Sequence, residues 1–278
     1  MKTRQEIKSL AKEAVAQQRG TAILIVLLFT VVSWAISYFS GLLVWIPVFG
    51  WAISIAAYGF TLVLAVNLDG EYIKIFRREN ADVGGIFTAL SINFWRKLGG
   101  MAWMTLWVTL WTMLLIIPGI IKGIAYFLTP YLLADCPNVK ARDALKLSMR
   151  ITKGHKLDIF VMMLSFIGWL ILSAFTFGIL WIVYVGPYMY ATYAGYFLEL
   201  REKALRDGVI TRSDLGWEEL SIIEDDVAEE IVPMEEVQVE EAPVADGLAA
   251  DVTTEEAPAD EELVSEVQDE KVQDGQES

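Results

Sequence analysis

The sequence predicts an all-α protein: a polytopic helical membrane protein with about six transmembrane helices in three hairpins, followed by a disordered acidic C-terminal tail. Three observations lead to this fold class. Apolar residues make up 55% of the 278 positions. They gather into uncharged runs of about twenty residues, the length that a helix needs to cross a ~30 Å hydrocarbon core. Basic residues return between alternate runs, as they do in cytoplasmic loops.

The net charge of −14 combines two regions of opposite sign. Residues 213–278 hold 24 acidic residues and one base, Lys271, whereas residues 1–212 hold 21 bases and 12 acids. A segment so acidic and so poor in large apolar residues buries too little surface to offset its ordering entropy. We therefore expect 213–278 to be a disordered cytoplasmic tail.

Residues 1–20 are expected to form a cytoplasmic amphipathic helix, because apolar residues recur at helical spacing with bases beside them. The apolar stripe and its flanking bases are Ile7, Leu10, Ala11, Ala14, Lys8, Lys12 and Arg19. The pattern fits a helix lying on a membrane surface and equally an ordinary solvated leader helix. Since no small-x-small cleavage site follows the first apolar run, we expect a retained anchor rather than a signal peptide.

The membrane domain is expected at residues 21–200. Its six spans fall near 21–40, 51–68, 98–117, 118–134, 159–177 and 179–198. Residues 98–134 carry one charge, Lys122, and as a single helix would be about 55 Å long, so they must fold into two spans. Pro118-Gly119 is the predicted break, because proline is tolerated in the first turn of a helix and penalised in its interior.

The bases near the ends of these spans predict the orientation. They lie in the loops 69–97 and 135–156 and in the basic juxtamembrane segment 201–212. Lys122 alone lies near an outer turn, where its side chain is expected to reach the interface. Since basic loops stay inside, we expect a multi-pass protein of the plasma membrane with cytoplasmic N and C termini.

The segment 134–160 holds the sole Cys and the sole His of the chain, and it includes an amphipathic helix near 140–153 with Asn138 as its expected N-cap. The basic residues on and after its polar face are the candidate lipid- or partner-binding residues. They are Arg142, Lys146, Arg150, Lys153, His155 and Lys156. The alternative is a helix that sets the topology and packs under the bundle. His155 is expected to be a satisfied interfacial side chain near Asp158 or Asp135, or a group that titrates near neutral pH.

Two further spans share a Pro-Tyr pair, at Pro130 and Pro187, at an offset of 57 residues, which suggests a repeated unit of a basic segment and a hairpin. Prolines, glycines and one acid at the ends of spans are the candidate structural residues. They are Pro118, Gly119, Pro130, Asp135, Gly154 and Pro187.

The residue inventory argues against an enzyme. One Cys and one His cannot build a metal cluster, and no catalytic constellation or Gly-rich phosphate loop is present, so we expect no catalytic residues, cofactor or metal. Nucleic acid is not expected as a partner. The best interpretation is a non-enzymatic scaffold or accessory factor whose basic cytoplasmic face meets anionic lipid head groups or an unknown membrane or cytosolic protein. A homo-oligomer is compatible with the small-xxx-small pair Ala191 and Gly195.

A transporter or channel for a small solute is the alternative function. It predicts a polar cavity lined by Thr109, Thr112, Tyr184 and Tyr188. No Asp or Glu is expected inside a span, since the acids nearest the spans fall at inner ends, and intramembrane acids commonly mark coupled ion pathways. Those acids are Asp69, Asp135, Asp158 and Glu199.

Several motifs in one order resemble an uncharacterised bacterial membrane family, the domain of unknown function family 975. They are PGIIK at 118–122, PYLLAD at 130–135, ALKLS at 144–148, GHKLDIF at 154–160, LSFIGW at 164–169, TFGI at 176–179 and PY at 187–188. The resemblance implies a multi-pass plasma-membrane protein and supplies no reaction. More distantly, the chain is similar to the membrane domain of some glycerophosphodiester phosphodiesterases, without their enzymatic barrel.

The acidic tail and the central basic helix lie on the same predicted side of the membrane. We expect the tail, through the group around Trp217, to compete with lipid for residues 140–153, because a tethered segment has a high effective concentration. The competition should weaken in high salt, which screens surface charges.

Overall fold

The computed structural model describes residues 2–46 and 48–217, and all regular elements in that part of the chain are helices, as predicted. The chain divides into two units, Met1–Ile231 and Val232–Ser278, and all described residues belong to the first. The α-helices are α1 (Arg4–Gln17), α2 (Arg19–Leu43), α3 (Phe49–Arg77), α4 (Gly85–Thr88), α5 (Phe94–Leu114), α6 (Ile116–Ala125), α7 (Thr129–Asp135), α8 (Ala141–Ile151), α9 (Lys156–Leu164), α10 (Ile167–Phe175) and α11 (Gly186–Arg206). A π-helical turn, η1 (Trp181–Val185), precedes α11, and a 3-10 turn, η2 (Ser213–Leu215), follows it.

Four stretches of the described chain are long and apolar enough to cross a membrane. They are Arg19–Leu43, Phe49–Arg77, Ile116–Asp135 and Lys156–Phe175. The other two predicted spans correspond to α5, which holds four tryptophans, and to η1 with α11, which holds four tyrosines in its α-helical part. These aromatic side chains suit a membrane interface. Together with the charged residues of each helix, they lower its mean hydropathy. Six spans therefore stay a prediction.

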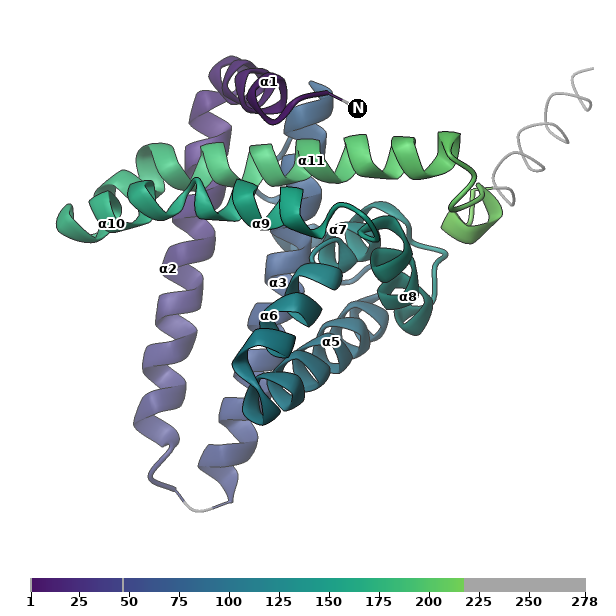
Figure 1. Ribbon diagram of the computed structural model, residues 1–278. Coiled ribbons are helices and arrows are strands. Elements are labelled where there is room, and N and C mark those ends of the chain that lie inside the picture. Colours follow the sequence, from purple (N-terminus) through teal and green to yellow (C-terminus); the bar gives the residue numbers. More distant parts are fainter. Residues whose placement is uncertain (1, 47, 218–278) are drawn as a thin grey trace, which may run out of the picture. The chain divides into compact units, whose positions relative to one another are not determined.

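The first hairpin consists of α2 and α3, which lie side by side (Figure 1). On α2 only Ala22, Ile25 and Val26, near its start, are buried. Trp34, farther along the helix, is 70% exposed, and Trp45, in the turn, is 87% exposed. One end of the hairpin is thus packed, and the other presents large apolar side chains, a surface typical of membrane contact.

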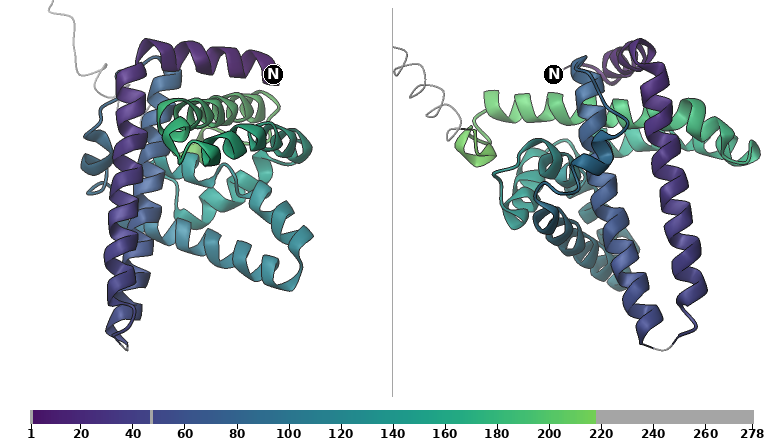
Figure 2. Two further views of the ribbon diagram at one scale, coloured as in Figure 1. Left: turned by 90° about the vertical axis from the view of Figure 1, so that its left-hand side faces the viewer. Right: turned by 180° about the vertical axis from the view of Figure 1, so that it is seen from behind.

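Helix α1 lies at the packed end of this hairpin (Figures 1 and 2). Its start is closed by a capping box, in which Glu6 N–H donates to the Thr3 hydroxyl and Thr3 N–H donates to the Glu6 carboxylate at 2.7 Å. Ile7 and Ala11 are fully buried where α1 packs against α11 and α3. The predicted apolar stripe therefore packs on the protein, which differs from both a helix on a membrane surface and a free leader helix.

The second hairpin is formed by α5, α6 and α7. The chain turns at Leu115, whose backbone is extended, three residues before the predicted break. Pro118 occupies the first turn of α6, where its missing N–H costs nothing. Gly119 lies against α5 so closely that an added Cβ would be 2.7 Å from Thr112 Cα. The pair therefore shapes the hairpin, with proline starting the helix and glycine permitting its close approach to α5.

The third hairpin runs from α9 and α10 back through η1 and α11. Its helices cross α2 and α3 instead of lying along them (Figures 1 and 2). The chain reverses at Phe177 and Gly178, both with positive φ. Pro187 follows η1, and the preceding residue, Gly186, donates its N–H to Trp181 O. Because proline lacks an N–H, this π-helical turn accommodates it without breaking the helix. Pro130 lies similarly in the first turn of α7.

Candidate functional site

The return helices of the three hairpins meet at one buried carboxylate, Asp135, which is the last residue of α7. Arg77, the last residue of α3, lies 2.7 Å from Asp135 Oδ1, and Arg201 of α11 pairs with Asp135 Oδ2. The side chain of Asp135 is 7% exposed. A carboxylate so buried requires such paired charges, and these pairs connect the three hairpins.

Arg201 is held between two aromatic rings as well as by this ion pair. Its guanidinium carbon lies 5.4 Å from the centroid of Phe197 and 4.8 Å from that of Trp217. Such stacking suits the planar guanidinium. It brings Trp217, which the sequence places in the acidic tail, against the membrane domain.

Arg96, near the start of α5, closes the C-terminal end of α7. Its guanidinium donates to the carbonyl oxygens of Leu133 at 2.6 Å, Cys136 at 3.1 Å and Val139 at 2.7 Å. These carbonyls would otherwise lack partners where the helix ends. Cys136 is fully buried beneath this turn. Burial, followed by the charge of Asp135, raises the pKa of its thiol to about 12, so the thiol stays protonated and unreactive at neutral pH.

The central helix α8 presents two chemically different faces, one buried in the domain and one exposed. Its buried face is made of Ala144, Leu145, Leu147, Ser148 and Ile151. Ser148 fastens this face to the second hairpin, because its hydroxyl donates to Ala125 O at 2.8 Å and accepts from Leu128 N–H at 3.2 Å. The helix thus packs against the domain and leaves its basic face exposed. The predicted N-cap is wrong: α8 begins after Lys140, and Asn138 instead donates to Gly216 O at 3.1 Å.

The six candidate binding residues occupy this exposed face and the turn after it. Arg142 lies over the ring of Trp103, 5.2 Å from its centroid, and Lys146 pairs with Asp143 at 3.1 Å. Lys153 and Lys156 form no ion pair with any described residue. Gly154 provides the positive φ that turns the chain between α8 and α9.

His155 and Arg150 each lie near an acidic side chain. His155 Nδ1 is 3.6 Å from Asp158 and has no hydrogen-bond partner in the described chain, so this contact with Asp158 is weak. Arg150 pairs with Asp214 at 3.3 Å and donates to Val209 O.

The segment 207–217 returns along α8. Leu215 is fully buried, and Asp214, Gly216 and Trp217 contact Arg150, Asn138 and Arg201 respectively. The folded chain thus continues at least to Trp217, beyond the predicted boundary at residue 213, because Leu215 and Trp217 have partners that composition does not reveal. The tail from 218 to 278 lies outside the described residues. Between this segment and α8 lies a cavity of about 320 Å³, whose charged lining residues are Lys140, Lys146 and Arg150 together with Asp143 and Asp214.

A second polar cluster joins α3 to α4, to the loop that follows α4 and to the start of α5, and the sequence did not reveal it. Lys97 Nζ donates to Asn67 Oδ1 at 2.7 Å and to Ala89 O at 3.0 Å, and Asn67 in turn donates to Ile86 O at 2.8 Å. Glu71, on the same helix, accepts from Asp82 N–H at 3.1 Å. A pattern of separate residues cannot predict such a network, because its members come from distant parts of the chain.

Acidic side chains do lie within a candidate span, contrary to expectation. The stretch Phe49–Arg77 includes Asp69 and Glu71, which are 7% and 3% exposed. Asp69 lies beside the hydroxyl of Tyr131. Close by, Tyr72 stacks on Tyr190 with ring centroids 5.3 Å apart. Helix α3 continues for nine residues beyond residue 68, where the second span was predicted to end.

Residues 99–204 match the family described as "Protein of unknown function (DUF975)". The matched range includes Asp135, α8 and Arg201, whereas Arg77 and α1 precede it. In the described chain, no group of three His, Cys, Asp or Glu residues is placed to hold a metal ion. No curated protein and no solved structure matches the chain. The similarity to glycerophosphodiester phosphodiesterase membrane domains stays a prediction. The match over residues 99–204 therefore supports the resemblance to the DUF975 family that the motifs indicated.

Proposed function

We propose that this protein is a non-enzymatic, multi-pass protein of the plasma membrane whose basic cytoplasmic face binds anionic lipid head groups. The observation that carries the proposal is the exposed basic row of α8, which borders the cavity of about 320 Å³. A helix whose apolar face is buried in the protein holds its bases in fixed positions. Each base near an anionic leaflet contributes about 1 kcal/mol. Arg142, Lys146, Arg150 and Lys153 outnumber Asp143 by three, which gives roughly 3 kcal/mol, and the pair of Arg150 with Asp214 offsets part of it.

Six spans in three hairpins, with both termini cytoplasmic, complete the proposal, and they require the third hairpin to lie along α2 and α3 in the membrane instead of across them. The turns of the hairpins are apolar and uncharged, and Trp45, Ile117 and Phe177 are each at least 72% exposed there. At the opposite ends of the return helices lie the bases Arg77 and Arg201, which meet at Asp135. Apolar turns and basic helix ends favour an insertion in which the basic ends face the cytoplasm.

Lipid binding by the full-length protein in a phosphate-free detergent tests this function. Short-chain phosphatidylglycerol is titrated against phosphatidylcholine of equal chain length. The double variant Lys146→Gln, Arg150→Gln should bind phosphatidylglycerol about thirtyfold more weakly, since it loses about 2 kcal/mol.

A matched control removes Arg19 and Arg206, two exposed bases without ion pairs in the described chain. Arg19→Gln, Arg206→Gln changes the net charge equally and should leave affinity within about twofold. If both double variants lose affinity equally, binding follows net charge alone and the proposed face is wrong. Equal affinity of the wild-type protein for both lipids also overturns the proposal.

Proton-coupled transport of a small solute is a second candidate function, favoured by one observation. Asp69 is a buried carboxyl inside a candidate span, beside Tyr131, and such acids often belong to proton pathways. The positions predicted to line a cavity argue against it, because Thr109 and Thr112 are exposed on α5 while Tyr184 and Tyr188 contact each other and neighbouring aromatics. Potential-driven proton uptake into proteoliposomes, lost in Asp69→Asn, would support transport. No uptake by the wild-type protein would oppose it.

A further inference from the structure

A pocket separates the start of α1 from α9. It has a volume of about 380 Å³ and is lined by Thr3, Arg4, Gln5, Lys8, Val161, Met162 and Ser165. Ligand sites in proteins commonly have volumes of about 300–1,000 Å³. One wall belongs to α1, and the other belongs to the candidate span Lys156–Phe175. The pocket therefore has one wall from a polar helix and one wall from an apolar helix.

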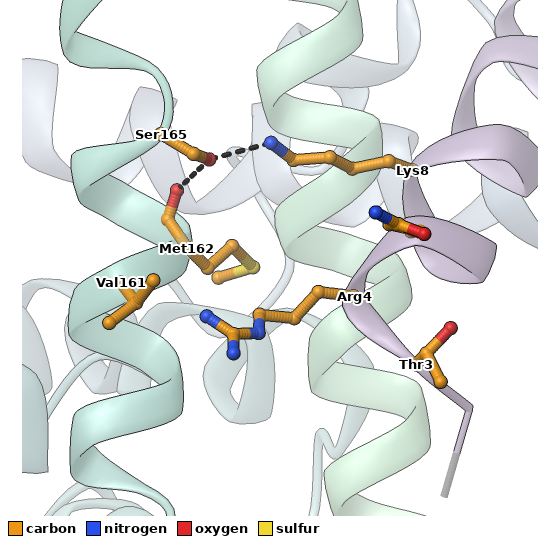
Figure 3. Close-up of a pocket in the computed structure, with 7 residues that line it drawn as sticks. Thr3, Arg4, Lys8, Val161, Met162 and Ser165 are labelled. Atoms are coloured by element: carbon orange, nitrogen blue, oxygen red, sulfur yellow. Dashed lines mark hydrogen bonds between the residues drawn. The ribbon is translucent and has the colours of Figure 1, made fainter.

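Two basic side chains extend from α1 across this pocket toward α9 (Figure 3). Lys8 donates to the hydroxyl of Ser165 at 2.6 Å, and that hydroxyl donates to Met162 O at 2.5 Å. Lys8 Nζ also lies 4.6 Å from the centroid of Phe166. Arg4 reaches the same space one helical turn earlier and forms no ion pair with a described residue. The guanidinium of Arg4 and two protons of Lys8 thus remain to bind an anion.

The positive charge of this face has no counter-ion in the described chain. Arg4, Lys8 and Lys12 follow one another at intervals of four residues, and Lys12 lies over the ring of Tyr188. The two acids of α1 are engaged elsewhere, Glu6 in the capping box and Glu13 with Arg78 at 3.4 Å. Partial burial, then the charges of Lys12 and Arg4, lower the pKa of Lys8. A bound anion would relieve this repulsion.

We propose that this pocket binds the phosphate of an anionic glycerophospholipid, with Arg4 and Lys8 as its ligands. Guanidinium and ammonium groups form strong charge-assisted hydrogen bonds with phosphate. The Ser165 hydroxyl holds Lys8 in position, while buried Met162 and exposed Val161 provide an apolar wall for the glycerol and the first acyl carbons. A soluble phosphate would use the same ligands but gain nothing from that wall.

This site deepens the proposed function and rests on it only in taking an anionic lipid as ligand. It differs from the face of α8 in helix, residues and pocket, so the two can fail separately. Native mass spectrometry of the full-length protein with short-chain phosphatidylglycerol should find two tightly retained lipids. The variant Arg4→Gln, Lys8→Gln should retain one lipid, and the affinity of the pocket for phosphatidylglycerol should fall at least tenfold.

Matched variants distinguish the two sites. Lys146→Gln, Arg150→Gln should lose the other lipid, while Arg19→Gln, Arg206→Gln should keep both. Arg4→Lys, Lys8→Arg should keep the pocket's lipid because both charges remain. Unchanged binding in Arg4→Gln, Lys8→Gln overturns the pocket, whatever the α8 variant does. If Arg4→Gln, Lys8→Gln loses a lipid while Lys146→Gln, Arg150→Gln keeps both, the pocket is supported and the α8 face is refuted.

Hydrogen exchange provides a second measurement on the wild-type protein, which does not depend on the folding of variants. Adding phosphatidylglycerol should slow amide exchange in residues 4–12 at least threefold, whereas phosphatidylcholine should not. Inorganic phosphate at equal concentration should have no effect. Equal protection by inorganic phosphate would assign the site to a soluble anion and overturn the lipid, and no protection by either would overturn the site.

Discussion

Asp135 and Arg201 form a buried ion pair that joins the end of the second hairpin to the return helix of the third. Their side chains are 7% and 8% exposed, and 66 residues of chain separate them. Arg77 adds the first hairpin to the same carboxylate. One acidic side chain therefore determines how three hairpins meet, and its removal should affect the whole domain.

Asp135→Asn should destabilise the protein by about 3–5 kcal/mol, because it leaves two guanidinium groups without their counter-charge. The free energy of unfolding in mixed micelles measures the effect. Asp143→Asn is the matched control, since the pair of Asp143 with Lys146 is half-exposed and should contribute about 0–1 kcal/mol. Equal losses would mean that Asp135 does not hold the hairpins together.

Gly119→Ala should destabilise the protein by about 1–3 kcal/mol, since the new methyl group would force α5 and α6 apart. Gly123→Ala, on the same helix, has no neighbour within 4 Å and should be neutral or stabilising by up to about 1 kcal/mol. Thermal unfolding in detergent compares the two. Similar behaviour of both variants would contradict the close approach at Thr112.

Acid should release the segment 207–217 from α8. The hydrogen bond from the Thr211 N–H, opposed by burial and aided by Arg150, lowers the pKa of Asp214. A carboxyl with a lowered folded-state pKa contributes stability above its unfolded pKa of about 4, and the contribution is lost as pH falls through the folded value. Asp214→Asn should therefore melt below wild type at pH 7, and the difference should disappear toward pH 3. A difference that persists unchanged at pH 3 would exclude this role.

The orientation can be tested with introduced thiols, because the natural one is inaccessible. Cys136 is fully buried with a raised thiol pKa and should resist impermeant reagents in every preparation. In a Cys136→Ala background, Lys153→Cys should label only in inside-out vesicles. Trp45→Cys, at the turn of the first hairpin, should label only in intact cells. The reverse pattern would overturn the proposed topology.

Sequence reasoning predicted the helical class and the two faces of α8, because these depend on periodicity within a single segment. Hydropathy and helical spacing are local properties, and each residue contributes to them without reference to distant parts of the chain. For the same reason the turns predicted near Pro118 and Gly178 lie close to the observed turns, which are at Leu115 and at Phe177 and Gly178.

The tertiary structure decided which side chains meet. It placed Asp69 inside a candidate span, buried the apolar stripe of α1 against α11, and brought Leu215 and Trp217 onto the domain. Charged and aromatic groups far apart in sequence pair only where helix packing brings them together, and the lowered cost of burying a charge depends on that partner. Composition therefore identified the bases of this protein, while packing determined that Arg77 and Arg201 meet at Asp135 and that Arg4 and Lys8 extend toward α9.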